Sequence, residues 1–280
     1  MIVVKLMGGH SNQMFQYAVG RQLALKHNTK LVLDCSWFKS YEKVDTPRVY
    51  ELGTYKIEAM KFTSPLLSKV IQKSGLIKKY TEPHYHYDSH INNLGPSVYL
   101  EGYFQSWRYF EDVRDTVVQD FTFKSDPQGA NKQLLETIKA DKNSVSLHIR
   151  RGDYVTNPNA NSFHGLKDMD YYSAALKEVK KKVKKPHVYV ISNDPEWCKE
   201  NLDLGVPATI VDNNDDLTGG AEDMRLMRAC RHNIMANSSF SWWGAWLNEN
   251  PDKIVVAPKQ WFNDPSKDTS DLIPKEWIRI

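Results

Sequence analysis

The segment SVSLHIRRGDYV (144–155) decides the fold, because a strand ends within it and a polar loop begins. Its first six residues are a short run of strand length that contains β-branched valine and isoleucine, and two arginines follow directly. Helical spacing begins at YYSAALKEVKKKVKK (171–185), and HVYVIS (187–192) is typical of a second buried strand. A strand, a helix and a strand in this order predict a βαβ unit with parallel strands.

The same alternation continues toward the C-terminal end of the sequence. Strands and helices are predicted in turn over ATIVD (208–212), AEDMRLMRAC (221–230), NIMANS (233–238), FSWWGAWLNEN (240–250) and IVVAP (254–258). Repeated βα units at this spacing build a parallel sheet. The second half of the chain therefore predicts a Rossmann-like α/β domain.

The first half opens with the same kind of unit. A strand, a helix and a strand are predicted over IVVKLM (2–7), NQMFQYAVGRQLALKH (12–27) and KLVLDC (30–35). A later strand is predicted in VYLEGYFQS (98–106), and the polar stretch KSDPQGANKQ (124–133) is the expected linker. We therefore expect two Rossmann-like domains, residues 1–130 and 131–280, that face each other across a central cleft.

Composition excludes several classes of protein. The net charge of +3 is too small for a general nucleic-acid binder. Three cysteines without CxxC spacing argue against a disulfide framework and a zinc site, and they favour a reducing compartment. No apolar run reaches the roughly 18 residues that a membrane span needs, so a cytoplasmic protein is expected.

One segment leaves membrane contact open. SPLLSKVIQKSGLIKKY (64–80) mixes leucine and isoleucine with lysine at nearly helical spacing. The favoured interpretation is a helix that turns its apolar side to the core and its lysines to solvent. The alternative is a basic amphipathic helix that makes a weak peripheral contact with an anionic membrane.

Polar clusters follow four of the predicted strands of the second half. They are HIRRGD (148–153), SNDPEW (192–197), DNNDD (212–216) and NSSFSW (237–242). Ligands of open α/β sheets bind in the crevice outside the carboxyl ends of the strands. A binding site is therefore expected at this edge of the second sheet.

The arginine pair in HIRRGDY (148–154) suits a phosphate or diphosphate. Guanidinium remains charged at physiological pH and binds oxyanions through two parallel hydrogen bonds. Neighbouring side chains of a strand point to opposite faces, so only Arg150 or Arg151 need meet the ligand, while the other braces a loop through a carboxylate such as Asp153. His148 projects on the same side as Arg150. The alternative is a buried histidine with an arginine–aspartate pair, and an adhesive Arg-Gly-Asp loop is disfavoured beside a buried strand.

Two further junctions carry weaker signals. Ser238, Ser239 and Ser241 offer hydroxyls and free N–H groups to an anion at a helix start, or a serine simply caps a Trp-rich helix. GGHSNQ (8–13) lacks the G-x-G-x-x-G pattern of dinucleotide sites, although Asp34 stands where a ribose-binding acid would. A nicotinamide-dependent oxidoreductase is therefore one alternative function, and a noncatalytic sugar-binding or adhesion module is another.

Metal binding is disfavoured at both acidic clusters. Asp168-Met-Asp170 directly precedes a predicted helix, where Asp170 is a natural N-cap. DNNDD (212–216) lacks the glycine and glutamate of a calcium-binding loop. We expect neither a metal nor a cofactor.

Four motifs together resemble one enzyme family. They are GGHSNQMFQYA (8–18), LEGYFQSWRYF (100–110), HIRRGDY (148–154) and NSSFSWWGAWLN (237–248). In this order they resemble the bacterial α-1,2-fucosyltransferases, glycosyltransferase family eleven. The resemblance implies a metal-independent glycosyltransferase B fold, an inverting reaction, GDP-β-L-fucose as donor and a terminal galactose as acceptor.

The resemblance also implies roles for single residues. Arg150 is expected to grip the β-phosphate, and His148 to contact guanine. Asp223 stands fifteen residues before Ser238-Ser239, as does the guanine-binding aspartate of related α-1,6 enzymes. Donor contacts are thus expected at these positions and at the adjoining Phe240.

The catalytic base is left between three candidates: Asp153, which is favoured, His164 and Asp168. On the glycine loop, Asn12 and Gln13 are expected to orient the acceptor or the fucose. That loop usually has the sequence GGLGNQ in the family, whereas this chain has His10 and Ser11 at the third and fourth positions. If the replaced glycine requires a positive φ, Ser11 costs on the order of 1 kcal/mol of strain.

Overall fold

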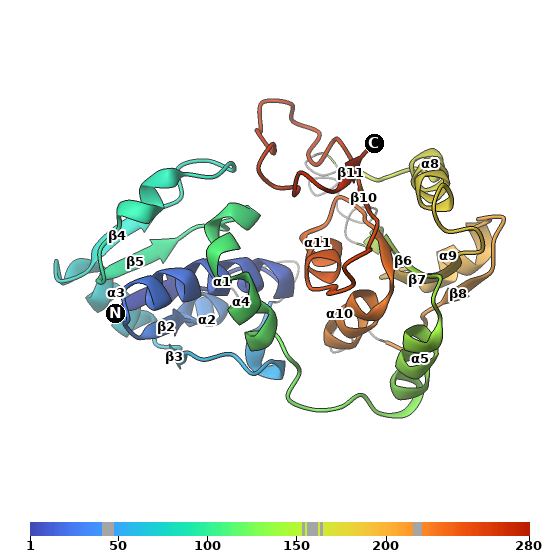
Figure 1. Ribbon diagram of the computed structural model, residues 1–280. Coiled ribbons are helices and arrows are strands. Elements are labelled where there is room, and N and C mark those ends of the chain that lie inside the picture. Colours follow the sequence, from blue (N-terminus) through green and yellow to red (C-terminus); the bar gives the residue numbers. More distant parts are fainter. Residues whose placement is uncertain (41–47, 153–154, 156–161, 163–164, 215–219) are drawn as a thin grey trace. The chain divides into compact units, whose positions relative to one another are not determined.

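The computed structural model describes residues 1–40, 48–152, 155, 162, 165–214 and 220–280, and these form two compact units (Figure 1). The N-terminal unit consists of Met1–Ser125 with Asp268–Ile273, and the C-terminal unit of Asp126–Lys267 with Pro274–Ile280. The predicted boundary at residues 130/131 therefore lies slightly late, and six residues expected in the second domain pack with the first. Ser106 and Arg108 hold that segment, because both donate hydrogen bonds to Asp271.

The N-terminal unit contains a parallel five-stranded sheet in the order β3-β2-β1-β5-β4. Its strands are β1 (Ile2–Lys5), β2 (Leu31–Asp34), β3 (Met60–Phe62), β4 (Lys78–Thr81) and β5 (Val98–Glu101). Its helices are α1 (His10–Lys26), α2 (Ser36–Ser40), α3 (Pro65–Lys73) and α4 (Arg114–Asp120). A Cβ atom on Gly20 would collide with Val4 and Leu31, so glycine lets α1 lie close against β1 and β2.

The C-terminal unit contains a parallel six-stranded sheet in the order β11-β10-β9-β6-β7-β8. Its strands are β6 (Ser144–Ile149), β7 (His187–Ser192), β8 (Ala208–Ile210), β9 (His232–Ile234), β10 (Val255–Ala257) and β11 (Ile278–Arg279). Its helices are α5 (Gly129–Ala140), α8 (Met169–Lys180), α9 (Pro195–Asn201), α10 (Gly220–Ala229) and α11 (Ser239–Trp246). Both units thus have the α/β architecture and parallel strands that the sequence predicts.

In the glycine loop the positive φ lies at Gly8, not at Ser11. Helix α1 begins at His10, and the positive φ of this loop, 74°, falls on Gly8. Ser11 is therefore helical, so the positive φ on which the expected strain depended is absent at this position. Asp168, not Asp170, caps α8, since its carboxylate accepts a hydrogen bond from the Tyr171 N–H at 2.9 Å.

Tryptophans anchor α11 in the C-terminal unit. Trp242 and Trp243 are fully buried, and the Trp242 ring lies 5.9 Å from Trp246 and 5.7 Å from Trp277. On its other side, α11 packs against α10 where Gly244 meets Met227. The Trp-rich segment is therefore a core helix whose N-terminus is held in a fixed place.

Candidate functional site

Three strand ends build the candidate site at the carboxyl edge of the C-terminal sheet. Strand β6 lies between β9 and β7, and all three run parallel. The chain therefore leaves the sheet at the same edge with Arg150–Gly152, Asn193–Asp194 and Asn237–Ser239. This is the edge at which the sequence predicts a ligand.

His148, near the end of β6, is buried and neutral. Its ring is 3% exposed and lies 5.6 Å from the ring of Phe240, the second residue of α11. Burial, and secondarily the charge of Arg150, lowers the pKa of His148 to about 3. Its Nδ1 has no hydrogen-bond partner within the described ranges, so this buried atom can accept or donate one bond to a ligand.

Arg150 follows β6 directly and is half-buried. Its backbone N–H donates to the hydroxyl of Tyr172, a buried residue of α8. The backbone of this arginine is thus fixed between the sheet and α8, which restricts where the guanidinium can reach.

Arg151 braces the neighbouring loop. Its Nε donates to Asp194 at 3.2 Å, its guanidinium lies 3.8 Å over the Trp197 ring, and its N–H donates to Asn193. The other carboxylate oxygen of Asp194 caps α9 by accepting from the Trp197 N–H at 3.2 Å. One arginine therefore does brace a loop, with Asp194 as its carboxylate partner. Asp153, which the sequence suggested for this pairing, lies outside the described residues, as does His164.

Gly152, the last residue of the arginine loop (Arg150–Gly152), packs closely against Asn193. A Cβ atom at this position would overlap the side-chain amide of Asn193. The glycine of the Arg-Gly-Asp tripeptide is therefore explained by packing against the β7 loop.

The N-terminus of α11 is capped by a serine, and the N–H groups of its first turn are of the kind that bind anions. Ser238 is the N-cap, and its Oγ accepts from the Phe240 N–H at 3.3 Å. Ser239 and Phe240 are half-buried in the first turn. The hydroxyl of Ser241 donates to the backbone carbonyls of Ala236 and Ser238, so it serves the helix start and is not directed to a ligand.

Asp223 lies in the first turn of α10, half-buried. Its Oδ1 accepts from the amide of Asn214 at 2.7 Å, and Asn214 in turn accepts from Asn131 of α5. This chain of amides orients the carboxylate. Sequence reasoning included Asn214 in the polar cluster 212–216 without giving it a role, and it missed Asn131, which lies in the expected linker.

In the N-terminal unit, Gln13 holds its loop through backbone groups. Its side-chain amide donates to Gly8 O at 3.1 Å and to Val49 O at 2.8 Å, and its Oε1 accepts from the Glu51 N–H. Asn12 accepts from Gln105 at 2.8 Å. Direct contact of Asn12 or Gln13 with a sugar stays a prediction.

Asp34 does not have the surroundings of a ribose-binding acid. It is completely buried, and its carboxylate accepts hydrogen bonds from the Ser36 N–H, from Ser68 Oγ and, at 2.7 Å, from the Tyr99 hydroxyl. With these donors in place the carboxylate belongs to the core, which removes the main sequence argument for a nicotinamide site.

Metal ligands do not gather in the described part of the chain, where no three His, Cys, Asp or Glu side chains form a group able to hold an ion. Asp168 caps α8, and Asp212 pairs with Lys199 at 2.7 Å. Asp215 and Asp216 lie outside the described residues.

Two pockets of the C-terminal unit are lined entirely by residues that the structure describes. One of about 430 Å³ lies at the carboxyl edge of β10, lined by Lys167, Asp168 and Tyr171 on one side and Pro258–Gln260 on the other. Burial lowers the pKa of Lys167. Sequence reasoning missed this pocket, whose signal is the polar pair after IVVAP (254–258).

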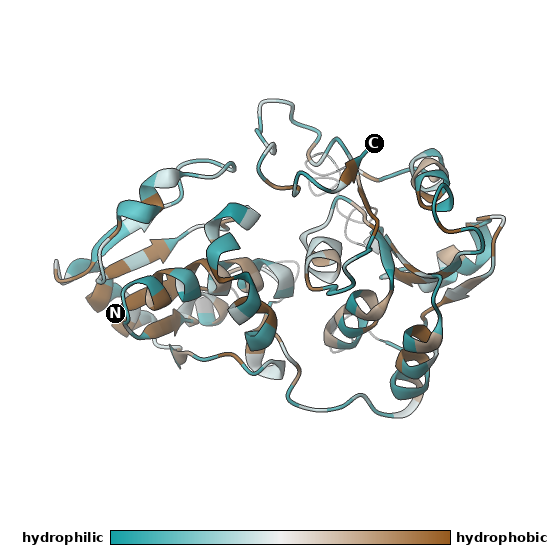
Figure 2. Ribbon diagram, viewed as in Figure 1, coloured by the Kyte–Doolittle hydropathy of each residue, from teal (hydrophilic) through white to brown (hydrophobic). Residues whose placement is uncertain are grey.

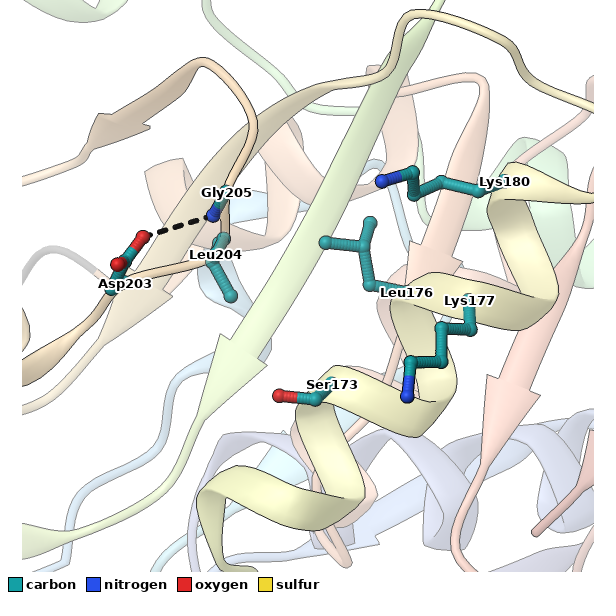
Figure 3. A pocket seen from close by; sticks show the side chains of 7 residues that line it. All are labelled: Ser173, Leu176, Lys177, Lys180, Asp203, Leu204 and Gly205. Atoms are coloured by element: carbon teal, nitrogen blue, oxygen red, sulfur yellow. Dashed lines mark hydrogen bonds between the residues drawn. The ribbon is translucent and has the colours of Figure 1, made fainter.

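The other pocket, of about 380 Å³, lies between α8 and the loop before β8 (Figure 3). Lys177 and Lys180 extend from α8, opposite Asp203, which accepts from the Gly205 N–H at 3.0 Å. Because that loop precedes β8, the pocket lies at the amino edge of the sheet, the edge opposite His148. It takes no part in the candidate site.

Two buried histidines predict that acid destabilises the fold. Burial lowers the pKa of His148 to about 3 and that of His10, stacked on Tyr55, to about 4, from 6.5. Below 6.5 the unfolded chain protonates both rings while the folded chain does not, so the free energy of unfolding falls as pH drops. Near pH 4.5 each histidine is expected to cost about 3 kcal/mol.

Urea unfolding of the protein and of the His148→Phe variant, near neutral pH and near pH 4.5, measures this effect. The fall in the free energy of unfolding between the two pH values should be smaller in the variant, by roughly the contribution of one histidine. An identical pH dependence in the two proteins would show that His148 is already charged or exposed in the folded state.

Comparison with known proteins places the chain among glycosyltransferases. The sequence profile of glycosyl transferase family 11 matches residues 1–280. An O-antigen biosynthesis glycosyltransferase of Escherichia coli, WbnK, is 36% identical, over 98% of this chain and 99% of its own. An α-1,2-colitosyltransferase of the same species is 34% identical, over 100% and 98%.

A more distant relative and a solved structure agree. Galactoside α-(1,2)-fucosyltransferase 2 of Oryctolagus cuniculus is 24% identical over 100% of this chain and 77% of its own. The crystal structure of fucosyltransferase NodZ from Bradyrhizobium superposes with a TM-score of 0.52, at 12% identity, over 87% of this chain and 90% of NodZ. The predicted glycosyltransferase B fold is confirmed. None of the described helices has the length and apolar character to cross a bilayer.

Proposed function

Because the chain belongs to glycosyl transferase family 11, we propose that it moves L-fucose from GDP-β-L-fucose to the 2-hydroxyl of a terminal galactose, with inversion at the anomeric carbon. One observation carries the proposal: a neutral, buried His148 and the neighbouring Arg150 lie at the sheet edge where α11 begins, with the His148 ring 5.6 Å from that of Phe240. This combination offers a cation and a helix N-terminus to a diphosphate.

The site must stabilise the negative charge that develops on the leaving group. Breaking the fucose–phosphate bond adds negative charge to GDP, and oxocarbenium character develops on the sugar. The N–H groups at the start of α11 are held by the helix before the reaction, and Arg150 follows β6 at the same sheet edge. Both are assigned the stabilisation of that charge. Such preorganised donors contribute several kcal/mol to a transition state.

Recognition of guanine is assigned to His148 and Asp223. A carboxylate accepts from guanine N1–H and N2–H, which adenine and uracil do not match, and Asn214 already orients this one. A neutral imidazole at His148 can offer one donor or acceptor without placing a second cation beside Arg150. The support for a GDP-sugar is the NodZ α-1,6-fucosyltransferase, whose crystals were soaked with GDP-fucose.

Asp153 remains the proposed general base. The acceptor hydroxyl attacks the face opposite GDP and must lose its proton, a task that we assign to the carboxylate two positions after Arg151 in the sequence. Asp168 is the weaker candidate because it caps α8 with one oxygen.

A second donor follows from one relative. The α-1,2-colitosyltransferase is 34% identical along the whole chain, and colitose is L-fucose without its 3-hydroxyl. A site that hydrogen-bonds this hydroxyl rejects the deoxy sugar by about 10⁴-fold, whereas an apolar site distinguishes the two weakly.

A donor competition assay tests the proposal. With a panel of β-galactosides, GDP-fucose should be turned over to GDP and a product carrying fucose on galactose O2. A rate with GDP-colitose that exceeds the GDP-fucose rate by more than about 100-fold would assign the chain to colitose. Absence of transfer from both donors to every galactoside would contradict the proposed acceptor.

Chelation gives a separate prediction. Since Arg150 and α11 are assigned the charge of the leaving group, EDTA should leave the initial rate unchanged, within about twofold. Rates are compared before and after dialysis against EDTA, with added Mn²⁺ as control. Loss of activity that only Mn²⁺ restores would contradict this prediction and favour a metal site at one of the acidic clusters, 168–170 or 212–216.

A further inference from the structure

Helix α3 of the N-terminal unit has its apolar side on the outside. Leu66 is 72% exposed, Val70 56% and Leu67 42%, whereas Ser68 is only 5% exposed. The favoured sequence interpretation, a helix with its apolar side on the core, is therefore wrong for Leu66, Leu67 and Val70. It holds for Ile71 of the helix, which is partly buried against the core strands. In Figure 2 the α3 ribbon and the turn after it carry hydrophobic, brown stretches.

The reversal has a cause in the core below the helix. Ser68 donates to the buried carboxylate of Asp34, and Gln72 donates to the Tyr99 hydroxyl at 3.1 Å. This polar network requires the serine and the glutamine on the inner side of α3. Residues four positions apart share a helix face, so Leu66 and Val70 must then point outward together.

Further apolar side chains extend the exposed surface. Leu76, in the turn after α3, is 83% exposed, and Met60, on the edge strand that leads into α3, is 60% exposed. Five of the ten large hydrophobic side chains exposed in the described part of the chain therefore lie between residues 60 and 76. Isolated exposed leucines are ordinary, but such a concentration indicates an interaction surface.

The charges around this surface have one sign. Residues 60–81 contain five lysines and neither aspartate nor glutamate. Lys69 and Lys73 are exposed on α3, on the same side as Leu66 by helical spacing. Of the five, Lys79 is paired with Glu101 and Lys61 lies over the Tyr50 ring at 4.2 Å.

From these observations we infer that the α3 surface (Leu66, Leu67, Val70 and Leu76 with Lys69, Lys73 and Lys78) docks on an anionic lipid bilayer. Leucines enter the boundary between headgroups and acyl chains, and the lysines contact the anionic headgroups. Two copies of this surface repel each other through their lysines. The exposed side chains also lack the Trp, Tyr and Arg that anchor protein interfaces.

Co-sedimentation with vesicles tests the inference without using enzymatic activity, so its outcome is independent of the proposed function. The protein should sediment with vesicles of phosphatidylglycerol and phosphatidylcholine in equal parts, and not with phosphatidylcholine alone. Leu66→Ser/Val70→Ser should weaken binding by about tenfold or more through lost apolar burial. Lys69→Gln/Lys73→Gln should weaken it similarly and reduce its dependence on salt.

Matched controls separate this surface from charge in general. Lys182→Gln/Lys184→Gln removes two exposed lysines from the segment after α8, and Leu25→Ser removes an exposed leucine from α1. Both variants should bind vesicles as the parent does, and all four should keep its melting temperature and its turnover of a free galactoside. Absent binding to anionic vesicles, or equal loss in the Lys182/Lys184 variant, overturns the inference. A concentration-dependent dimer abolished by Leu66→Ser/Val70→Ser does so as well, because it assigns the surface to self-association.

Discussion

Replacement of Arg150 by alanine is expected to lower kcat/KM for GDP-fucose by about a hundredfold or more, because it removes the cation nearest the proposed diphosphate seat. The melting temperature should stay that of the parent, since the backbone N–H that binds Tyr172 is retained. Initial rates over a range of GDP-fucose concentrations, with thermal unfolding of the same samples, measure both quantities.

Arg151→Ala is the matched control. It removes the contacts with Asp194 and Trp197, so it should lower the melting temperature while the loss of activity follows the loss of folded protein. If Arg150→Ala keeps more than about a tenth of the parental kcat/KM, a loss below about 1.4 kcal/mol, its role at the diphosphate is wrong.

Trp242→Ala is expected to reduce the free energy of unfolding by about 3–5 kcal/mol, the cost of emptying a large aromatic site in a core. Trp242 is completely buried and contacts Trp243, Trp246 and Trp277, so no neighbour can fill the space without leaving its own contacts. Urea unfolding measures the loss, and binding of GDP to the folded fraction reports whether the N-terminus of α11 moves.

Trp242→Phe keeps most of the ring and should cost clearly less. A loss for Trp242→Ala no greater than for Trp242→Phe would mean that the cluster does not fix α11.

The alternation of strands and helices in the second half, and the first β-α-β unit, could be predicted because most of these strands are short runs rich in apolar or β-branched residues and each helix has its own spacing. Strands β3, β4 and β11 were not predicted, since they are short and β4 (KKYT) is not apolar. The cluster at the sheet edge followed for the same reason, since parallel strands end together. His148, Arg150, Ser238 and Asp223 are found on the elements predicted for them. Contact of these residues with a donor remains proposed.

The orientation of α3 could not be predicted from its own residues. Its leucines and lysines fit either orientation, and the choice depends on Asp34 and Tyr99, which belong to β2 and β5. The partner of Arg151 was missed for a similar reason, because Asp194 is 43 positions away in the chain. Long-range polar contacts of this kind leave no periodic signal.

Asp194 ties the arginine loop to the start of α9 with its two oxygens. Arg151 and Asp194 therefore hold the two loops together: a change at Arg151 leaves the half-exposed carboxylate of Asp194 without its arginine partner, and a change at Asp194 also removes a helix cap. We expect these positions to be replaced together over evolution, and a transplanted arginine loop to require α9 with it. Arg151 and Gly152, the first two residues of the Arg-Gly-Asp tripeptide, are thus explained by their structural contacts and not by an adhesive function.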